Sequence, residues 1–81
     1  MATPFGDRIR ELREGRALTA RVVAERLGIA RATLYAWEAG DHQPDAAPLA
    51  ALIALYGCDE ATELRLWRLR AGSEAPAEVA A

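Results

Sequence analysis

The chain has few of the residues from which most catalytic and metal sites are built. It has 81 residues with one histidine, one cysteine, one serine and no lysine, so all ten basic residues are arginine. His42 lies in a predicted loop and Ser73 lies near the end of the chain, so they suggest no nucleophile–base pair. One histidine and one cysteine do not make a metal site. We therefore expect no enzyme activity, no metal and no other cofactor.

Signals for export or for membrane insertion are also missing. Cys58 is the only cysteine, so no internal disulfide can form, and a reducing cytoplasm fits this composition. The first ten residues lack the apolar segment of a signal peptide. No apolar run approaches the length that spans a bilayer. We therefore expect a cytoplasmic protein with no membrane partner.

The charge is weakly acidic but unevenly distributed. The net charge of −2 is an objection to nucleic-acid binding, for which a basic face is expected. Residues 1–31 hold seven arginines and four acidic residues, a balance of +3, whereas residues 45–81 hold three arginines and six acidic residues, a balance of −3. A molecule with one basic end can still bind phosphates at that end.

Apolar residues recur at helical spacing in five segments, each bounded by glycine or by a residue that caps helices. The predicted helices cover residues 4–14, 20–27, 31–39, 46–56 and 60–71. Gly15 is expected to end the first helix, and Gly28 to turn the chain after the second. The length fits one domain. The sequence thus predicts an all-α, compact five-helix bundle over residues 1–72 and a flexible acidic tail over residues 73–81.

The last predicted helix is apolar on two opposite sides. One side carries Leu64, Trp67 and Ala71, and the other carries Thr62, Leu66 and Leu69. A surface helix of a monomer needs only one apolar stripe, so the second stripe can pair with another subunit about a two-fold axis. We expect Trp67 and Leu64 to face the core and the side with Thr62, Leu66 and Leu69 to form a dimer interface. Alternatively, the tail or the first helix buries both sides.

Residues 17–40, ALTARVVAERLGIARATLYAWEAG, carry the clearest functional pattern. A short helix ends at Gly28, and a second helix begins about three residues later. Leu18 precedes the first helix, Ile29 fills the turn, and Leu34 and Trp37 supply the inward stripe of the second helix. This spacing is typical of a helix-turn-helix, whose second helix can lie in the major groove of DNA. From periodicity alone, three ordinary helices joined by short turns explain it equally well.

The segment LTARVVAERLGIARATLYAWEAG resembles the helix-turn-helix of the Cro/phage-repressor (Xre-like) type. The resemblance extends back through RIRELRE, residues 8–14, and forward through the GDHQP loop and the helix PLAALIALYG. It therefore covers roughly residues 4–57. The resemblance implies a lambda-repressor-like DNA-binding domain, which is a five-helix bundle that binds operator DNA, usually as a dimer.

The resemblance also assigns roles to individual residues. Those matching base-contacting positions are Arg31, Ala32, Thr33, Tyr35 and Ala36. Those expected to contact phosphates are Thr19, Ala20, Arg21, His42 and Gln43. Arginine can bind a guanine through two hydrogen bonds, and amides at a helix start can hold a phosphate. Arg13 and Glu38 match a buried ion pair that ties the first helix to the third. The simpler alternatives are solvated surface charges, an exposed tyrosine and a weak surface salt bridge.

The chain departs from this family's pattern at several positions that face DNA. It has alanine at 20, 30, 32 and 39, where such domains often carry polar residues, and Asp41 in a loop that is often basic. Each alanine removes a possible hydrogen bond, so a monomer should bind DNA weakly. We expect a sequence-specific DNA-binding transcriptional regulator, acting as a homodimer on a short palindromic operator of double-stranded DNA, with no small-molecule ligand. The alternative is a protein-interaction module on the same scaffold with weak or no DNA binding.

Overall fold

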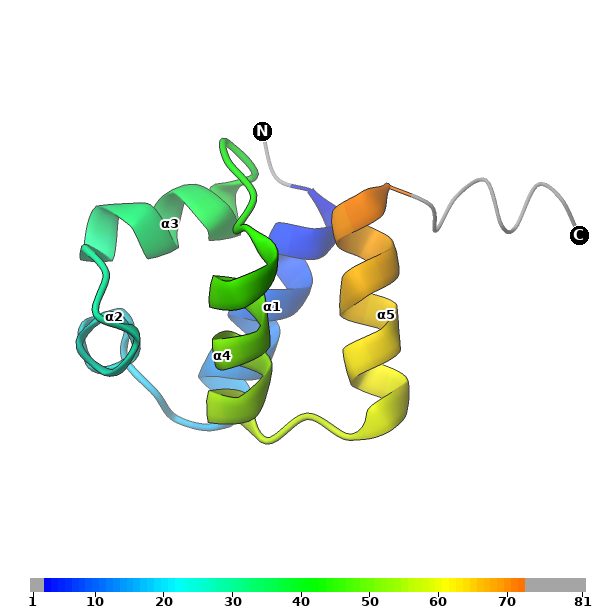
Figure 1. Cartoon of the computed structure of the whole chain (residues 1–81). Helices are drawn as coiled ribbons and strands as arrows, with labels where there is room; N and C mark the ends of the chain where they lie inside the picture. Colours follow the sequence, from blue (N-terminus) through cyan, green and yellow to red (C-terminus); the bar gives the residue numbers. More distant parts are fainter. Residues whose placement is uncertain (1–2, 73–81) are drawn as a thin grey trace, which may run out of the picture.

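Residues 3–72 fold into five helices joined by short loops (Figure 1). The computed structural model describes residues 3–72. The helices are α1 (Pro4–Gly15), α2 (Ala20–Leu27), α3 (Arg31–Ala39), α4 (Ala46–Tyr56) and α5 (Glu60–Ala71), and residues 3–72 contain no strand. The prediction of an all-α five-helix fold is therefore confirmed, with four of the five helices at their predicted bounds. The predicted tail, residues 73–81, lies outside the described residues.

Three helices begin at capping side chains that the sequence indicates. Thr3 and Thr19 each accept a hydrogen bond from the amide three residues further on, at 3.0 and 3.2 Å, and Asp59 accepts one from the Thr62 amide at 2.8 Å. These bonds satisfy amides that have no partner inside the helix. The hydrogen bonds from Thr62 hold the pKa of Asp59 below its usual value, because they stabilise the carboxylate.

The helix α1 ends at Gly15, as predicted, but the turn after it has a left-handed residue that is not glycine. That residue is Ala17, with φ at 55°. Side chains disfavour this conformation. Arg13 holds the turn in place, because its carbonyl accepts from the Leu18 amide and its guanidinium donates to the Leu18 carbonyl, both at 3.1 Å. A glycine in the sequence therefore does not mark the left-handed residue here.

The core forms where α1 packs against α3 and α5, and where α2 packs against α3 and α4. Figure 1 shows α4 and α5 side by side in front of α1, with α2 and α3 on the other side of α4. All five helices contribute to the core, whose largest buried side chains include Phe5, Ile9, Val23, Leu34, Leu49, Leu52 and Leu66. None of the helices in residues 3–72 is long and apolar enough to span a bilayer.

Gly6 allows α1 to approach α3 unusually closely. A Cβ atom at this position would lie 2.8 Å from the carbonyl oxygen of Trp37 and closer still to that of Glu38. Both obstacles are backbone atoms, which cannot rotate away. The end of α3 is therefore held against the first turn of α1, and only glycine fits there.

The expected roles of the two sides of α5 are the wrong way round. Leu66 is fully buried and Leu69 is 6% exposed, whereas Leu64 is 50% exposed and Trp67 is half-buried. Leu66 and Leu69 pack into the core of the same chain, with Thr62 half-buried beside them, so they cannot serve as the dimer interface. The two stripes are equally apolar along the sequence, and only the packing of α5 on α1 selects between them.

Candidate nucleic-acid interface

A left-handed glycine sets the angle between α2 and α3. Gly28 has φ at 70°, and the amide of Ile29 closes the end of α2 by donating to the Ala24 carbonyl at 3.0 Å. Helices very often end with a glycine in this conformation. Because α3 begins only three residues later, the turn positions α3 across α2, as in a helix-turn-helix.

The side of α3 that faces away from the core carries most of the residues assigned to base contacts. Arg31, Ala32, Thr33 and Tyr35 are exposed, and Tyr35 is 53% exposed. Within residues 3–72, neither a hydrogen bond nor an ion pair engages the Arg31 guanidinium. Ala36 is half-buried, and its carbonyl accepts from the amides of the following loop. The outer side of α3 therefore offers one unengaged cation, one hydroxyl and one phenol.

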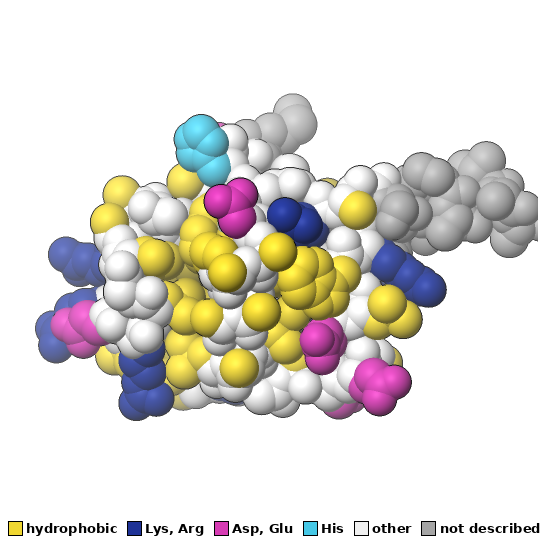
Figure 2. All heavy atoms as spheres, viewed as in Figure 1, with side chains coloured by type: hydrophobic (Ala, Val, Ile, Leu, Met, Phe, Trp, Pro, Cys, Tyr) yellow, Lys and Arg dark blue, Asp and Glu magenta, His cyan; other side chains and the backbone are white. Residues whose placement is uncertain are grey.

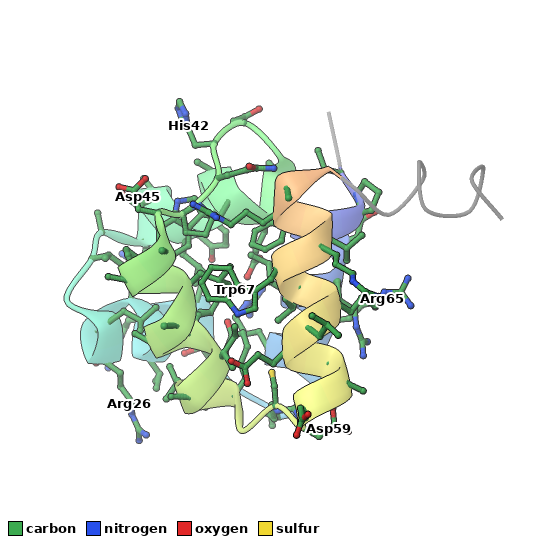
Figure 3. The ribbon with its side chains drawn as sticks, turned by 45° about the vertical axis from the view of Figure 1, so that its right-hand side comes forward. Arg26, His42, Asp45, Asp59, Arg65 and Trp67 are labelled. Carbon is green, nitrogen blue, oxygen red and sulfur yellow. The ribbon has the colours of Figure 1, made fainter. Side chains whose placement is uncertain are left out.

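The residues assigned to phosphate contacts lie at the start of α2 and in the loop after α3. Thr19, Arg21, His42 and Gln43 are exposed, and His42 projects from the molecule in Figure 3. Ala20 differs, because it is 4% exposed and its methyl group packs into the core. Its side chain is therefore not available to DNA, and the contact expected from Ala20 would come from its backbone amide, which has no partner within the helix.

Further basic groups surround α2. In Figure 2 the dark blue side chains on the left of the molecule gather around this helix. Arg26 projects from its last turn into solvent (Figure 3), and Arg21 lies 3.6 Å from Glu25 in an exposed pair that contributes little. Arg26 was not among the residues assigned to DNA from the sequence. Its place on the outer side of α2 could have been read from helical spacing, since it lies two residues after the buried Ala24 and therefore about 200° around the helix from it.

A buried ion pair fixes the other side of α3 to α1. The guanidinium of Arg13 donates two hydrogen bonds to the Glu38 carboxylate, at 2.7 and 3.0 Å. The side chains are 11% and 4% exposed. Because the carboxylate stabilises the cation, it raises the pKa of Arg13 above its usual value. The weak surface salt bridge is therefore not what the structure contains, and the pair joins α1 and α3 as the resemblance implied.

The geometry agrees with the comparison to known families. A family model described as a helix-turn-helix domain matches residues 4–66. The chain belongs to this helix-turn-helix family, which is of the Xre/Cro-type group. Comparisons with curated proteins and with solved structures found no match. Membership of the family indicates DNA binding as the general activity.

A cleft that no pattern in the sequence indicated lies beside α3. It has a volume of about 570 Å³ and lies between α1 and α3. Its lining residues are Asp7, Arg10, Arg13, Glu14, Tyr35, Glu38 and Ala39. Tyr35 therefore borders both the cleft and the outer side of α3. No set of three or more potential metal-ligating side chains occurs within the described part of the chain.

Proposed function

We propose that the protein is a sequence-specific DNA-binding transcriptional regulator that acts as a homodimer on a short palindromic operator. The observation that carries the proposal is the unengaged guanidinium of Arg31 at the exposed start of α3. Arginine at this end of a recognition helix can donate two hydrogen bonds to one guanine. Thr33 and Tyr35 are also exposed on this helix.

The alanines of α3 make part of the same surface apolar. Ala32 is exposed and Ala36 is half-buried, and a methyl group can contact the methyl group of thymine. Each such contact is weak, so Arg31 supplies most of the discrimination. Recognition is expected to depend on few base pairs in each half-site.

Phosphate contacts then determine how the domain is positioned on the duplex. The amides at the start of α2, with Thr19 and Arg21, face one strand, and His42 and Gln43 lie in the loop that follows α3. Contacts of this kind carry no sequence information, but they supply much of the affinity and make it depend on salt. The acidic overall balance of −2 limits this affinity, so two half-sites bound together are needed.

A second candidate function is a protein-interaction module with weak or no DNA binding. The observation that favours it is the scarcity of hydrogen-bonding groups on α3, because Ala32, Ala36 and Ala39 offer none from their side chains. In that case the scaffold would retain its shape, and another apolar surface would bind a partner protein.

Selection from a random pool of double-stranded DNA, repeated at two salt concentrations, tests the proposal. Enrichment of a palindromic site, with affinity that falls as salt rises, is the expected result. Absence of enrichment at both concentrations would reject the regulator and favour the interaction module.

Arg31→Ala separates base reading from phosphate binding. We expect relaxed preference at one base-pair position, with a loss of discrimination of about 1–3 kcal/mol at that position. Arg26→Ala is the matched control, because Arg26 is an exposed arginine on the neighbouring helix, and it should weaken binding equally for all sequences. A uniform loss for Arg31→Ala would show that Arg31 contacts only phosphate.

A further inference from the structure

The cleft between α1 and α3 has charged walls that the candidate DNA interface does not use. Its volume of about 570 Å³ lies within the usual range for sites of small ligands. The end of α3 lies beside the first turns of α1 (Figure 1). Tyr35 and Ala39 line the cleft from α3, and Asp7, Arg10 and Glu14 line it from α1. The walls therefore combine charged groups with one aromatic ring.

The buried ion pair forms a neutral part of these walls. The guanidinium of Arg13 donates two hydrogen bonds to Glu38 and a third to the Leu18 carbonyl. Both side chains of the pair are buried, and their charges cancel. The pair therefore adds no net charge to the cleft, and a ligand would respond to the exposed groups.

Three exposed charges on α1 remain for a ligand. Asp7, Arg10 and Glu14 are three and four residues apart, so they share one side of the helix. Within residues 3–72, none of the three side chains takes part in an ion pair or a hydrogen bond. Their charges alternate along α1 as negative, positive and negative, so the unpaired groups carry more negative than positive charge.

This pattern of charge excludes several classes of ligand. A phosphate or another simple anion would face two carboxylates and only one cation. A metal ion would lack ligands, because no three potential metal-ligating side chains come together in the described part of the chain. An apolar molecule would remove the charged groups from water without giving them a partner. A small organic cation is the class that fits.

We propose that the cleft binds a free amino acid of the arginine type. Its guanidinium can accept one protein carboxylate as partner through two hydrogen-bonded N–H groups, while its ammonium pairs with the other. Its own carboxylate then meets Arg10, which stands between Asp7 and Glu14. A planar guanidinium also stacks on aromatic faces, and the ring of Tyr35 is 53% exposed. The three charges of the ligand thus complement the three charges of α1.

This site departs from the expectation of no small-molecule ligand that the sequence supports. It goes beyond the proposed function and shares only Tyr35 with the surface assigned to DNA. Its tests need no DNA. Failure of this site and failure of operator binding are therefore separate results.

Titration of the full, nitrogen-15-labelled chain with L-arginine, followed by NMR, is the first test. We expect saturable shifts of the amides of residues 7–14 and 35–39, with a Kd on the order of 1 mM for so small a ligand in an exposed cleft. L-Citrulline is the matched control, because it has the same shape but an uncharged urea in place of the guanidinium. Shifts that do not saturate, or equal affinity for citrulline, would overturn the proposal.

Removal of both carboxylates is the second test. Asp7→Asn combined with Glu14→Gln should weaken arginine binding by about tenfold or more, because each lost charge had a charged partner. Glu60→Gln combined with Glu63→Gln is the matched control, since it makes the same change in net charge on α5 and neither residue lines the cleft. Equal weakening in both double variants would show that arginine responds only to net charge, and would overturn the site.

Circular dichroism establishes that both double variants remain folded. If the Asp7 and Glu14 variant does not fold, the comparison of arginine with citrulline on the wild-type chain decides the question without it.

A blocked arginine distinguishes the free amino acid from an arginine residue of a peptide. Nα-acetyl-L-arginine methylamide carries the same net charge as arginine but lacks the ammonium and the carboxylate. We expect it to bind about fivefold more weakly than arginine, and Arg10→Gln should reduce this preference because the ligand carboxylate loses its partner. Equal affinity of the wild-type chain for both compounds would show that only the guanidinium is recognised, and would overturn the assignment of a free amino acid.

Discussion

The two sides of α3 differ in how many interactions their side chains make within the domain. The inner side holds Leu34, Trp37 and Glu38, all buried, and it is bound to α1 by two charged hydrogen bonds. The outer side holds Arg31 and Tyr35, which are exposed, among alanines that are exposed or half-buried. The domain thus uses most of its interactions to position α3 and leaves few groups to read a ligand.

This difference explains how a sparse surface can still be specific. A guanidinium discriminates between bases only if its helix is held at a defined angle and depth in the groove. Gly6 and the Arg13–Glu38 pair provide that restraint from the far side of the helix. The following predictions test whether the inner side really supplies the rigidity and the outer side only the contacts.

The largest effect is expected from removing one partner of the ion pair. Arg13→Ala leaves the Glu38 carboxylate buried without its cation, so the free energy of unfolding should fall by about 3–5 kcal/mol. Chemical denaturation measures this change. The double variant Arg13→Met with Glu38→Leu is the control and should lose much less, because it leaves no charge behind. Equal losses for both variants would show that packing, and not the charge, matters at this contact.

A methyl group at Gly6 should have the next largest effect. Gly6→Ala forces the backbones of α1 and α3 apart, and we expect a loss of about 3 kcal/mol, the upper end of the usual cost of overpacking. Gly15→Ala is the matched control at the other end of α1, where no atom lies within 4 Å of the added carbon. That variant should gain about 0.5 kcal/mol, because alanine favours the helix. In thermal unfolding, we expect a lower midpoint than that of the wild type for Gly6→Ala and a higher midpoint for Gly15→Ala.

A smaller effect of opposite sign is expected beside the ion pair. The Tyr56 hydroxyl is buried without a hydrogen-bond partner among residues 3–72, and burial raises the pKa of this tyrosine well above its usual value. Tyr56→Phe removes the unsatisfied group and should raise the free energy of unfolding by about 1 kcal/mol. Tyr35→Phe, which removes an exposed hydroxyl, should leave it unchanged. A loss of stability for Tyr56→Phe would show that the hydroxyl does have a partner in solution.

The smallest effect on stability should come from the outer side of α3. Tyr35→Ala removes a 53% exposed ring, and we expect the free energy of unfolding to change by no more than about 0.5 kcal/mol. Binding to the selected operator should nevertheless weaken, as measured by a titration with labelled DNA. A large loss of stability would show that the outer side also supports the fold, and the contrast between the two sides would fail.

The helices were predictable because their signals are local. Thr3, Thr19 and Asp59 cap helices through bonds that span only three residues, and Gly28 ends α2 within its own turn. The turn after α1 was not predictable in the same way. There, hydrogen bonds between Arg13 and Leu18 hold Ala17 in a conformation that its own side chain disfavours.

The candidate site likewise has features that local sequence predicts and features that it does not. That Thr33 and Tyr35 are exposed follows from helical spacing, because each lies one residue, about 100°, from the buried Leu34. That Ala20 is buried does not, since an alanine at a helix start is equally suited to either environment. The cleft between α1 and α3 depends on two helices that are distant in the sequence, so no local pattern could indicate it.

The order of the amino acids was enough to establish five helices, the helix-turn-helix and the outward side of α3, because periodicity, caps and turns act over a few residues. Which stripe of α5 faces the core was settled only when α5 packed against α1. Leu66 and Leu69 then became core residues, whereas Leu64 stayed exposed and Trp67 half-buried. On an isolated helix, burial of either of two equally apolar stripes would give the same free energy. Only the shape of the neighbouring helices decides which stripe is buried.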